Sequence, residues 1–451
     1  MTTHARTPGF RPALLGFGLA AVLVLSACEK KEAVLTGERE GVRAILDDNG
    51  ADALASTQAP EAAPPLNLPA TRANTSWTQS IATPQTRTSH PSLGSAPSLI
   101  WSVDIGEGDG KRNRITADPL VAGGRVFTLD ATAQVTAVST AGEVIWTRDL
   151  TPPNDNRGDG SGGGMAYNDG VLFVSSGFGR LTALNAGTGQ EIWQQNLRTT
   201  GTGAPTVFGG LVYLVSGDEV GWAIDAKNGR VRWQIAGTPN RNNVLGAPSP
   251  AVSGKYVVFA FGSGEVQGAF RQGGLRRWDA QVAGSRGGFS TGSVADITSD
   301  PVIDGGRIYV GSHAGRTVAL DLENGERLWT APDGPLNPVW PAGNSIFMIS
   351  DRNELLRLSA SDGSRLWGKP LPLFTSAKPK RQNRIFAHHG PIVAGGRLIV
   401  VSNDGQMRTF NPQNGQLLSQ RPLPDGATTN PVVAGNTLYI VSTKGQLMAF
   451  R

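Results

Sequence analysis

Cysteine is almost absent from this sequence, and charge of either sign is sparse. Cys28 is the only cysteine in 451 residues, so no disulfide can form within the chain. Charged residues make up 17% of the chain, and the net charge is +5. A positive charge this small gives no sign of a nucleic-acid partner, and we expect none.

Apolar runs long enough to cross a membrane are also missing. An apolar run of 13 residues, Ala13 to Leu25, follows Arg6 and Arg11. A transmembrane helix needs about 20 residues, whereas a positive segment followed by a shorter apolar run is typical of a secretory signal. We therefore predict a signal peptide over residues 1–27.

The predicted signal ends in Leu25-Ser26-Ala27-Cys28, which resembles the lipobox of bacterial lipoproteins. The resemblance implies that Cys28 is lipidated and becomes the new N-terminus; the alternative is a buried core thiol. In lipoprotein sorting, an Asp after the cysteine favours the inner membrane, and this chain has Glu29. The resemblance therefore implies a lipid anchor in the cell outer membrane, on its periplasmic face.

The sequence also lacks the apolar periodicity of amphipathic helices. The chain holds 59 Gly and 29 Pro, and its repeating part shows no apolar stripe at helical spacing. Residues 28–97 are predicted to be the lipidated cysteine and an N-terminal tether, extended over the Ala- and Pro-rich residues 59–69. Trp77 is an isolated aromatic residue in this tether, and we expect it to pack on the outside of the main domain.

From Leu99 onward the chain repeats itself. The clearest copy opens at Pro301, passes a turn at Gly305 and Gly306, and closes with Ala319-x-Asp321-x-x-x-Gly325-x-x-x-Trp329. Eight copies over residues 99–451 give about 44 residues each, and four-stranded propeller blades run to about 40–45. The sequence predicts an all-β domain over residues 98–451, an eight-bladed β-propeller of four-stranded antiparallel blades.

The last copy is one strand short. It opens at Pro431 and the sequence stops at Arg451, before any closing strand. An unassigned strand of the right kind, residues 99–103, lies at the start of the domain. Pairing of this strand with the C-terminal blade would close the ring and leave no unpaired edge there.

The Ala-x-Asp-x-x-x-Gly-x-x-x-Trp element resembles the docking motif of quinoprotein propellers. In such folds an indole of one blade covers the glycine turn of its neighbour, and its N–H reaches a carbonyl. Asp225, Asp321 and Asn185 are expected to cap these turns. The copy that opens at Pro391 has Ser419 in place of its tryptophan. The expected docking residues are Trp101, Trp146, Trp193, Trp233, Trp278, Trp329 and Trp367.

Other candidate sites are weaker. The run Gly158–Gly164 looks like a phosphate cradle but lacks the Lys and Ser/Thr of a P-loop, so a loop between blades is favoured. His388-His389 has no second spaced His or Cys pair, so no metal site is predicted. The basic residues of the stretch 378–384 are expected in a solvated loop, with a headgroup contact as the alternative.

Lipobox, Ala/Pro-rich tether and eight repeats together resemble the BamB family. The resemblance implies a non-enzymatic scaffold that belongs to the barrel assembly complex as a monomer, binds the periplasmic POTRA domains of BamA and needs no cofactor. It places partner contacts in two stretches, with ordinary variable loops as the alternative. These contact residues are Arg241, Asn242, Asn243, Val244, Leu245, Asp296 and Thr298.

Two alternatives remain at this point. One is a PQQ-dependent dehydrogenase, since quinoprotein dehydrogenases share the propeller. Those enzymes hold the quinone with a vicinal disulfide, a Ca²⁺ site and a carboxylate base. The disulfide is impossible here, and no calcium-loop spacing of carboxylates occurs. The sequence therefore argues against an enzyme. The other alternative is a periplasmic ligand-binding propeller.

Overall fold

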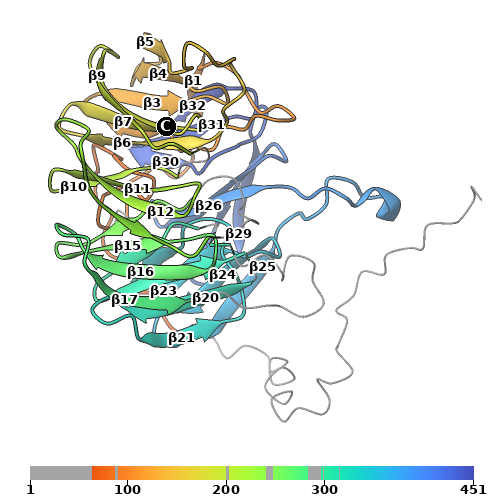
Figure 1. Ribbon diagram of the computed structural model, residues 1–451. Coiled ribbons are helices and arrows are strands. Elements are labelled where there is room, and N and C mark those ends of the chain that lie inside the picture. Colours follow the sequence, from red (N-terminus) through yellow and green to blue (C-terminus); the bar gives the residue numbers. More distant parts are fainter. Residues whose placement is uncertain are drawn as a thin grey trace, which may run out of the picture.

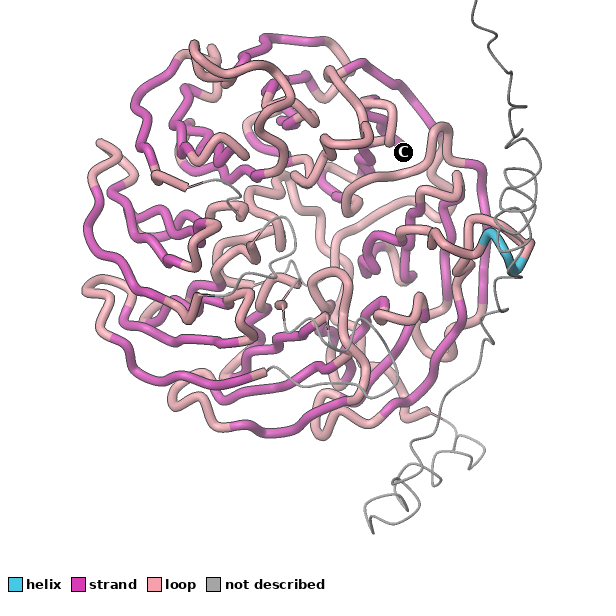
Figure 2. Tube along the Cα trace, turned by 45° about the vertical axis from the view of Figure 1, so that its right-hand side comes forward, coloured by secondary structure: helices cyan, strands magenta, loops and turns pink. Residues whose placement is uncertain are grey.

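The computed structural model of the protein describes residues 63–86, 90–199, 203–239, 247–282, 296–297, 299–313 and 315–451. These residues form eight four-stranded antiparallel sheets arranged around a central axis (Figures 1 and 2). The predicted eight-bladed propeller is confirmed. No described segment forms a helix that is long and apolar enough to cross a membrane.

The first four blades follow one another along the chain. Blade 1 consists of β2 (Leu120–Ala122), β3 (Arg125–Leu129), β4 (Gln134–Ser139) and β5 (Val144–Asp149). Blade 2 consists of β6 (Gly163–Asn168), β7 (Val171–Ser176), β8 (Arg180–Asn185) and β9 (Glu191–Asn196). Blade 3 consists of β10 (Thr206–Phe208), β11 (Leu211–Ser216), β12 (Val220–Asp225) and β13 (Val231–Ala236). Blade 4 consists of β14 (Ala251–Val252), β15 (Tyr256–Ala260), β16 (Glu265–Phe270) and β17 (Arg276–Gln281).

The other four blades complete the ring. Blade 5 consists of β18 (Val302–Asp304), β19 (Arg307–Ser312), β20 (Arg316–Asp321) and β21 (Arg327–Ala331). Blade 6 consists of β22 (Trp340–Ala342), β23 (Ser345–Ile349), β24 (Glu354–Ser359) and β25 (Arg365–Pro370). Blade 7 consists of β26 (His388–Ala394), β27 (Arg397–Ser402), β28 (Gln406–Phe410) and β29 (Leu417–Pro422). Blade 8 consists of β30 (Val432–Ala434), β31 (Thr437–Val441), β32 (Gln446–Phe450) and β1 (Leu99–Asp104).

Burial within each blade distinguishes a channel side from a rim side. The first strands are largely buried, and all except β6 and β26 have only two or three residues. First strands of neighbouring blades contact one another. The fourth strands are largely exposed, as in β5 and β29. The first strands therefore line the central channel, the fourth strands form the rim, and the apolar core lies between the blades.

Blade 8 combines the two ends of the propeller sequence. Its outer strand β1 runs antiparallel to β32, with Trp101 opposite Ala449 and Val103 opposite Leu447. Just before β1, the backbone of Ser98 exchanges two hydrogen bonds with Arg451, at 2.8 and 2.9 Å. This pairing joins the first and last strands of the ring, so the last copy in the sequence lacks no strand in space.

Each of the seven docking tryptophans lies on the turn glycine of the next blade. A Cβ built on any of these glycines would lie 2.5–2.9 Å from the indole, and each glycine has φ between +69° and +94°. A side chain there is excluded by both the contact and the backbone conformation. Asp225, Asp321 and Asn185 cap three of these turns as predicted, through bonds of 2.9–3.0 Å to backbone N–H groups.

Trp77 lies in the central channel, so the expectation that it packs on the outside was wrong. Its backbone pairs with Val121 of β2, and its indole is 1% exposed beside Trp340 of β22. The next residues continue across the channel: the Thr78 carbonyl accepts from Tyr167, and the Gln79 side chain bonds both backbone groups of Val207. Residues 77–82, called the plug below, bury an aromatic ring that would otherwise be in water.

Residues on either side of the plug pack against the ring. The buried guanidinium of Arg357 donates to the Pro64 carbonyl at 2.9 Å, and the Gln413 side chain bonds Ala63 and Leu66. These contacts join the N-terminal segment to blades 6 and 7. The described part of the predicted tether is therefore folded against the propeller.

Candidate functional site at the channel mouth

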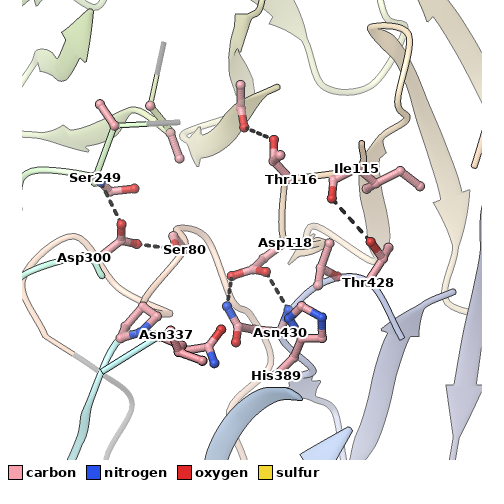
Figure 3. A pocket seen from close by; sticks show the side chains of 17 residues that line it. Ser80, Ile115, Thr116, Asp118, Ser249, Asp300, Asn337, His389, Thr428 and Asn430 are labelled. Atoms are coloured by element: carbon pink, nitrogen blue, oxygen red, sulfur yellow. Dashed lines mark hydrogen bonds between the residues drawn. The ribbon is translucent and has the colours of Figure 1, made fainter. Parts of the chain in front are cut away.

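The plug leaves one end of the channel open as a cavity of about 380 Å³ (Figure 3). Its walls are built mainly by residues that precede the channel strands, and Ser80 of the plug contributes to the lining. The lining residues are Ser80, Ile115, Thr116, Asp118, Gly163, Gly203, Ala204, Ala247, Ser249, Asp300, Leu336, Asn337, Pro338, His389, Thr428, Thr429 and Asn430.

A simple sequence rule locates much of this lining, and it was missed in the sequence analysis. Asp118, Ser249, Asp300, Asn337 and Asn430 each stand directly before the proline that opens a repeat. The residue before a proline is held extended by the pyrrolidine ring. Because the repeats are arranged around one axis, the same position in each copy recurs around the channel.

Side chains at this position bond one blade to another. The two carboxylate oxygens of Asp118 accept from the Asn430 backbone at 2.8 Å and from its amide at 3.1 Å. Asp300 accepts from the Ser249 backbone at 2.8 Å and from the Ser80 hydroxyl at 2.6 Å. The first pair links blades 1 and 8, and the second links blades 4 and 5 to the plug (Figure 3). These carboxylates therefore stabilise the ring and its plug.

The remaining polar groups give the cavity its electrostatic character. Burial lowers the pKa of His389 to about 4, helped by the neighbouring His388, so this ring is uncharged at neutral pH. Two hydroxyls in the lining, those of Ser249 and Thr429, are buried and have no partner among the described residues. The described lining includes two aspartates and neither Lys nor Arg. The charged side chains of the described lining are therefore acidic only.

The predicted partner-contact residues are only partly within the described chain. Arg241 to Leu245 and Thr298 lie outside the described residues, as does the predicted lipidation site Cys28. Asp296 is described and is 4% exposed, with its backbone carbonyl bonded to His313 at 2.8 Å. Ala247 and Ser249, which follow the first stretch, line the cavity.

The glycine run, the histidine pair and the basic stretch singled out in the sequence all lie at or between blade strands. Gly163 and Gly164 begin β6, so the glycine run leads into a channel strand. His388 bonds the Pro372 carbonyl at 2.8 Å. The described residues hold no group of three or more His, Cys, Asp or Glu placed to bind a metal ion. The basic stretch 378–384 lies in the connection between β25 and β26.

Comparison with known proteins gives consistent results. A family model described as outer membrane protein assembly factor BamB matches residues 131–369 and 375–451. The chain is 24% identical over 331 residues to outer membrane protein assembly factor BamB of Yersinia pestis, covering 72% of this chain and 81% of the relative. Its fold is similar to BamB from Moraxella catarrhalis, with a TM-score of 0.65 at 17% identity, covering 79% of this chain and 100% of that one.

A quinohemoprotein alcohol dehydrogenase from Comamonas testosteroni also has a similar fold. The TM-score is 0.60 at 16% identity, covering 83% of this chain and 80% of the enzyme chain, a likeness that concerns the fold alone. The described residues of the channel mouth do not fit PQQ, the cofactor of quinoprotein dehydrogenases. PQQ carries several carboxylates, whereas the described lining offers two aspartates, an uncharged histidine and no cation to bind them. The vicinal disulfide is ruled out by the single cysteine.

Proposed function

The chain belongs to the family of outer membrane protein assembly factor BamB, and on that premise we propose that it is a non-enzymatic scaffold of the outer-membrane β-barrel assembly machinery. Its role is to support the folding and insertion of outer-membrane proteins. A lipid on Cys28 holds it at the periplasmic face of the outer membrane. Its partners in this role are the POTRA domains of BamA.

One observation carries the non-enzymatic part of this proposal. The chain's own plug around Trp77 occupies part of the channel in which a propeller enzyme would hold its cofactor, and it leaves a cavity at the mouth. The carboxylates at the mouth are engaged in bonds between blades and to the plug. A ring fixed in this way loses little conformational entropy when it docks, which suits a binding scaffold.

The partner contacts are proposed in the stretch Arg241–Leu245, with Asp296 and Thr298 in the next connection between blades. Because Asp296 is 4% exposed, we assign it the role of holding its connection in place. The residues around Leu245 then supply the direct contact.

Co-purification from detergent-solubilised membranes tests the scaffold. We expect the wild-type chain to recover barrel assembly components, and Leu245→Glu to reduce that recovery at least ten-fold, because a charge in an apolar contact is costly. Leu275→Glu is the matched control, since Leu275 is 70% exposed on the rim of blade 4. Recovery of no assembly component by the wild-type chain would reject the proposed function. Equal recovery with Leu245→Glu would reject this contact face.

Two further measurements test whether the protein is an enzyme and whether it carries a lipid anchor. Addition of PQQ and Ca²⁺ is expected to produce no dye-linked oxidation of alcohols or sugars; activity above background would support the enzyme. Cells grown with radioactive palmitate are expected to label the wild-type chain but not Cys28→Ser, because the acyl chains that anchor the protein depend on that thiol. A wild-type chain that takes up no label would contradict the lipid anchor.

A further inference from the structure

The connection between β25 and β26 forms an arm that projects from the ring (Figures 1 and 2). Its two sides pair at Phe374 and Ile385, and the Thr375 N–H donates to the Arg384 carbonyl at 3.0 Å. A short 3-10 helix, η4 (Pro379–Arg381), forms its tip. We call residues 373–386 the basic arm. The Phe386 N–H also donates to the Leu373 carbonyl at 2.8 Å, so main-chain hydrogen bonds hold the two sides of the arm together.

The basic arm concentrates positive charge without compensation. Lys378, Lys380, Arg381 and Arg384 are all exposed, and residues 371–387 include no Asp or Glu. None of the four cations lies within ion-pair distance of a described carboxylate. Their positive field therefore faces solvent.

Exposed aliphatic side chains accompany these cations. Leu373 is 36% exposed and Ile385 is 52% exposed, on opposite sides of the arm beside the Phe374–Ile385 bridge. Elsewhere on the ring, exposed aliphatic residues of this kind lie mostly on the rim strands. The arm thus combines cations and exposed aliphatic side chains on a projection that is accessible from several sides.

We propose that the basic arm binds the surface of an anionic phospholipid bilayer, an inference that rests on the proposed attachment of this protein to the outer membrane. Phosphate headgroups accept hydrogen bonds from Lys and Arg, and the aliphatic side chains reach the headgroup boundary. The acyl chains on Cys28 keep the arm close to the bilayer, so a weak local attraction is sufficient.

An acidic protein surface is a less suitable occupant. The four cations are distributed along a projecting hairpin rather than around a concave pocket, and exposed aliphatic residues lie beside them. A bilayer presents anionic and apolar groups together over a flat area, and it requires no fixed register of contacts.

A reporter on the arm tests this proposal in the full lipidated chain. Asn383 is exposed, and Asn383→Cys adds a single free thiol for a fluorescent dye, because acylation uses the Cys28 thiol. The chain is reconstituted on phosphatidylethanolamine vesicles with or without phosphatidylglycerol, both carrying a headgroup quencher. We expect quenching to require phosphatidylglycerol and to fall as salt is raised.

Charge removal then measures the contribution of the arm. We expect the equilibrium constant for surface association to fall about five-fold for each of Lys378, Lys380, Arg381 and Arg384 replaced by Gln, since each basic residue near an anionic surface contributes about that factor. With all four replaced, quenching should match that on phosphatidylethanolamine alone.

A matched control removes the same charge elsewhere. Lys111, Arg112, Lys227 and Arg230 are exposed outside the arm, and their replacement by Gln should leave quenching unchanged. If the control variant lost as much quenching as the arm variant, the net charge of the chain would explain the association and the proposal would be overturned. A wild-type chain that attaches to the vesicles while its dye is not quenched would also overturn the proposal.

Two other outcomes point elsewhere. If the four arm substitutions reduced recovery of assembly components in the co-purification, the arm would be a protein contact, and the bilayer proposal would be rejected. A chain that carries no acyl group and does not attach contradicts the proposed anchor itself.

Discussion

Seven of the eight junctions between neighbouring blades are sealed by an indole, whereas the junction between blades 7 and 8 is sealed by the chain's own N-terminal segment. At the seven, a tryptophan on the rim strand covers the glycine turn of the next blade. At the eighth, Ser419 replaces the tryptophan, and the outer hairpin has no turn because β32 and β1 belong to the two ends of the propeller. An indole there would have no glycine turn to cover.

Hydrogen bonds replace the indole at this eighth junction. Arg397 donates to the carbonyls of Leu93, Gly94 and Ser95, and Arg421 donates to Pro97 at 3.1 Å. A backbone hydrogen bond from the Gly395 N–H to the Pro91 carbonyl at 3.0 Å attaches the same segment to the β26–β27 turn. Neighbouring blades can therefore be joined in two ways. One is an indole packed on a glycine turn, and the other is a separate chain segment that makes hydrogen bonds.

The largest effect is expected at an indole junction. Trp329→Ala removes a side chain that is 7% exposed, packed on Gly363 and bonded to the Ala360 carbonyl at 3.1 Å. The free energy of unfolding should fall by about 3–5 kcal/mol, measured by urea denaturation followed by circular dichroism. Ser419→Ala, the counterpart at the eighth junction, loses the 2.8 Å bond between the hydroxyls of Ser419 and Thr409 and should change it by about 1 kcal/mol or less. Equal effects at the two junctions would contradict the comparison.

The glycine side of the same contact should give the next largest effect. Gly363→Ala places a Cβ 2.5 Å from the Trp329 ring at φ +74°. Gly305 has φ +60° with nothing within 4 Å of its added Cβ, so Gly305→Ala isolates the backbone cost. We expect Gly363→Ala to destabilise by about 1–3 kcal/mol more than Gly305→Ala, by the same urea assay. No difference between them would show that the indole does not require glycine.

At the eighth junction, removal of a guanidinium should act locally. Arg397→Met keeps the aliphatic stem but leaves the carbonyls of Leu93, Gly94 and Ser95 without their donor. The expected cost is about 1–3 kcal/mol, together with faster amide hydrogen exchange over residues 91–98. Arg365→Met, which breaks only the partly exposed pair with Glu354, should cost about 1 kcal/mol or less. Unchanged exchange over residues 91–98 would contradict the sealing role.

The smallest effect concerns the one indole junction that lacks its hydrogen bond. The Trp233 N–H has no hydrogen-bond partner among the described residues, because the Tyr213 hydroxyl donates to the Arg271 carbonyl at 3.1 Å. Tyr213→Phe frees that carbonyl for Trp233, so stability at neutral pH should change by less than about 1 kcal/mol. A loss of more than 2 kcal/mol would show that Trp233 cannot use it.

The same tyrosine predicts a pH effect. Burial raises the pKa of Tyr213 to about 12, against about 10 in the unfolded chain. The folded chain therefore holds this proton more tightly, and the stability it contributes is complete below pH 10 and is lost as the pH rises towards 12. Urea denaturation across this window should show a smaller loss for Tyr213→Phe than for the wild-type chain. Parallel losses would assign the alkaline sensitivity to other groups.

The repeat-borne part of the structure was predictable. The spacing of Pro, Gly and Trp in copies such as Pro301 to Trp329 indicated four strands per blade, and the short last copy indicated the missing strand. The channel-mouth lining was present in the sequence as the residue before each proline, but recognising it requires knowing that these positions face one axis. Nothing in the local sequence around Trp77 distinguishes a channel residue from one that packs on the outside.

The sequence by itself determined the number of blades, their strand order and the indole–glycine junctions, because each of these depends on neighbours within one repeat or between consecutive repeats. Only the tertiary structure decided where residues 63–86 and 90–98 go: across blades 6 and 7, into the channel as the plug, and over the eighth junction. The contacts with blades 6 and 7 and at the eighth junction join positions about 300 residues apart, and the space that the plug fills exists only once the ring has closed.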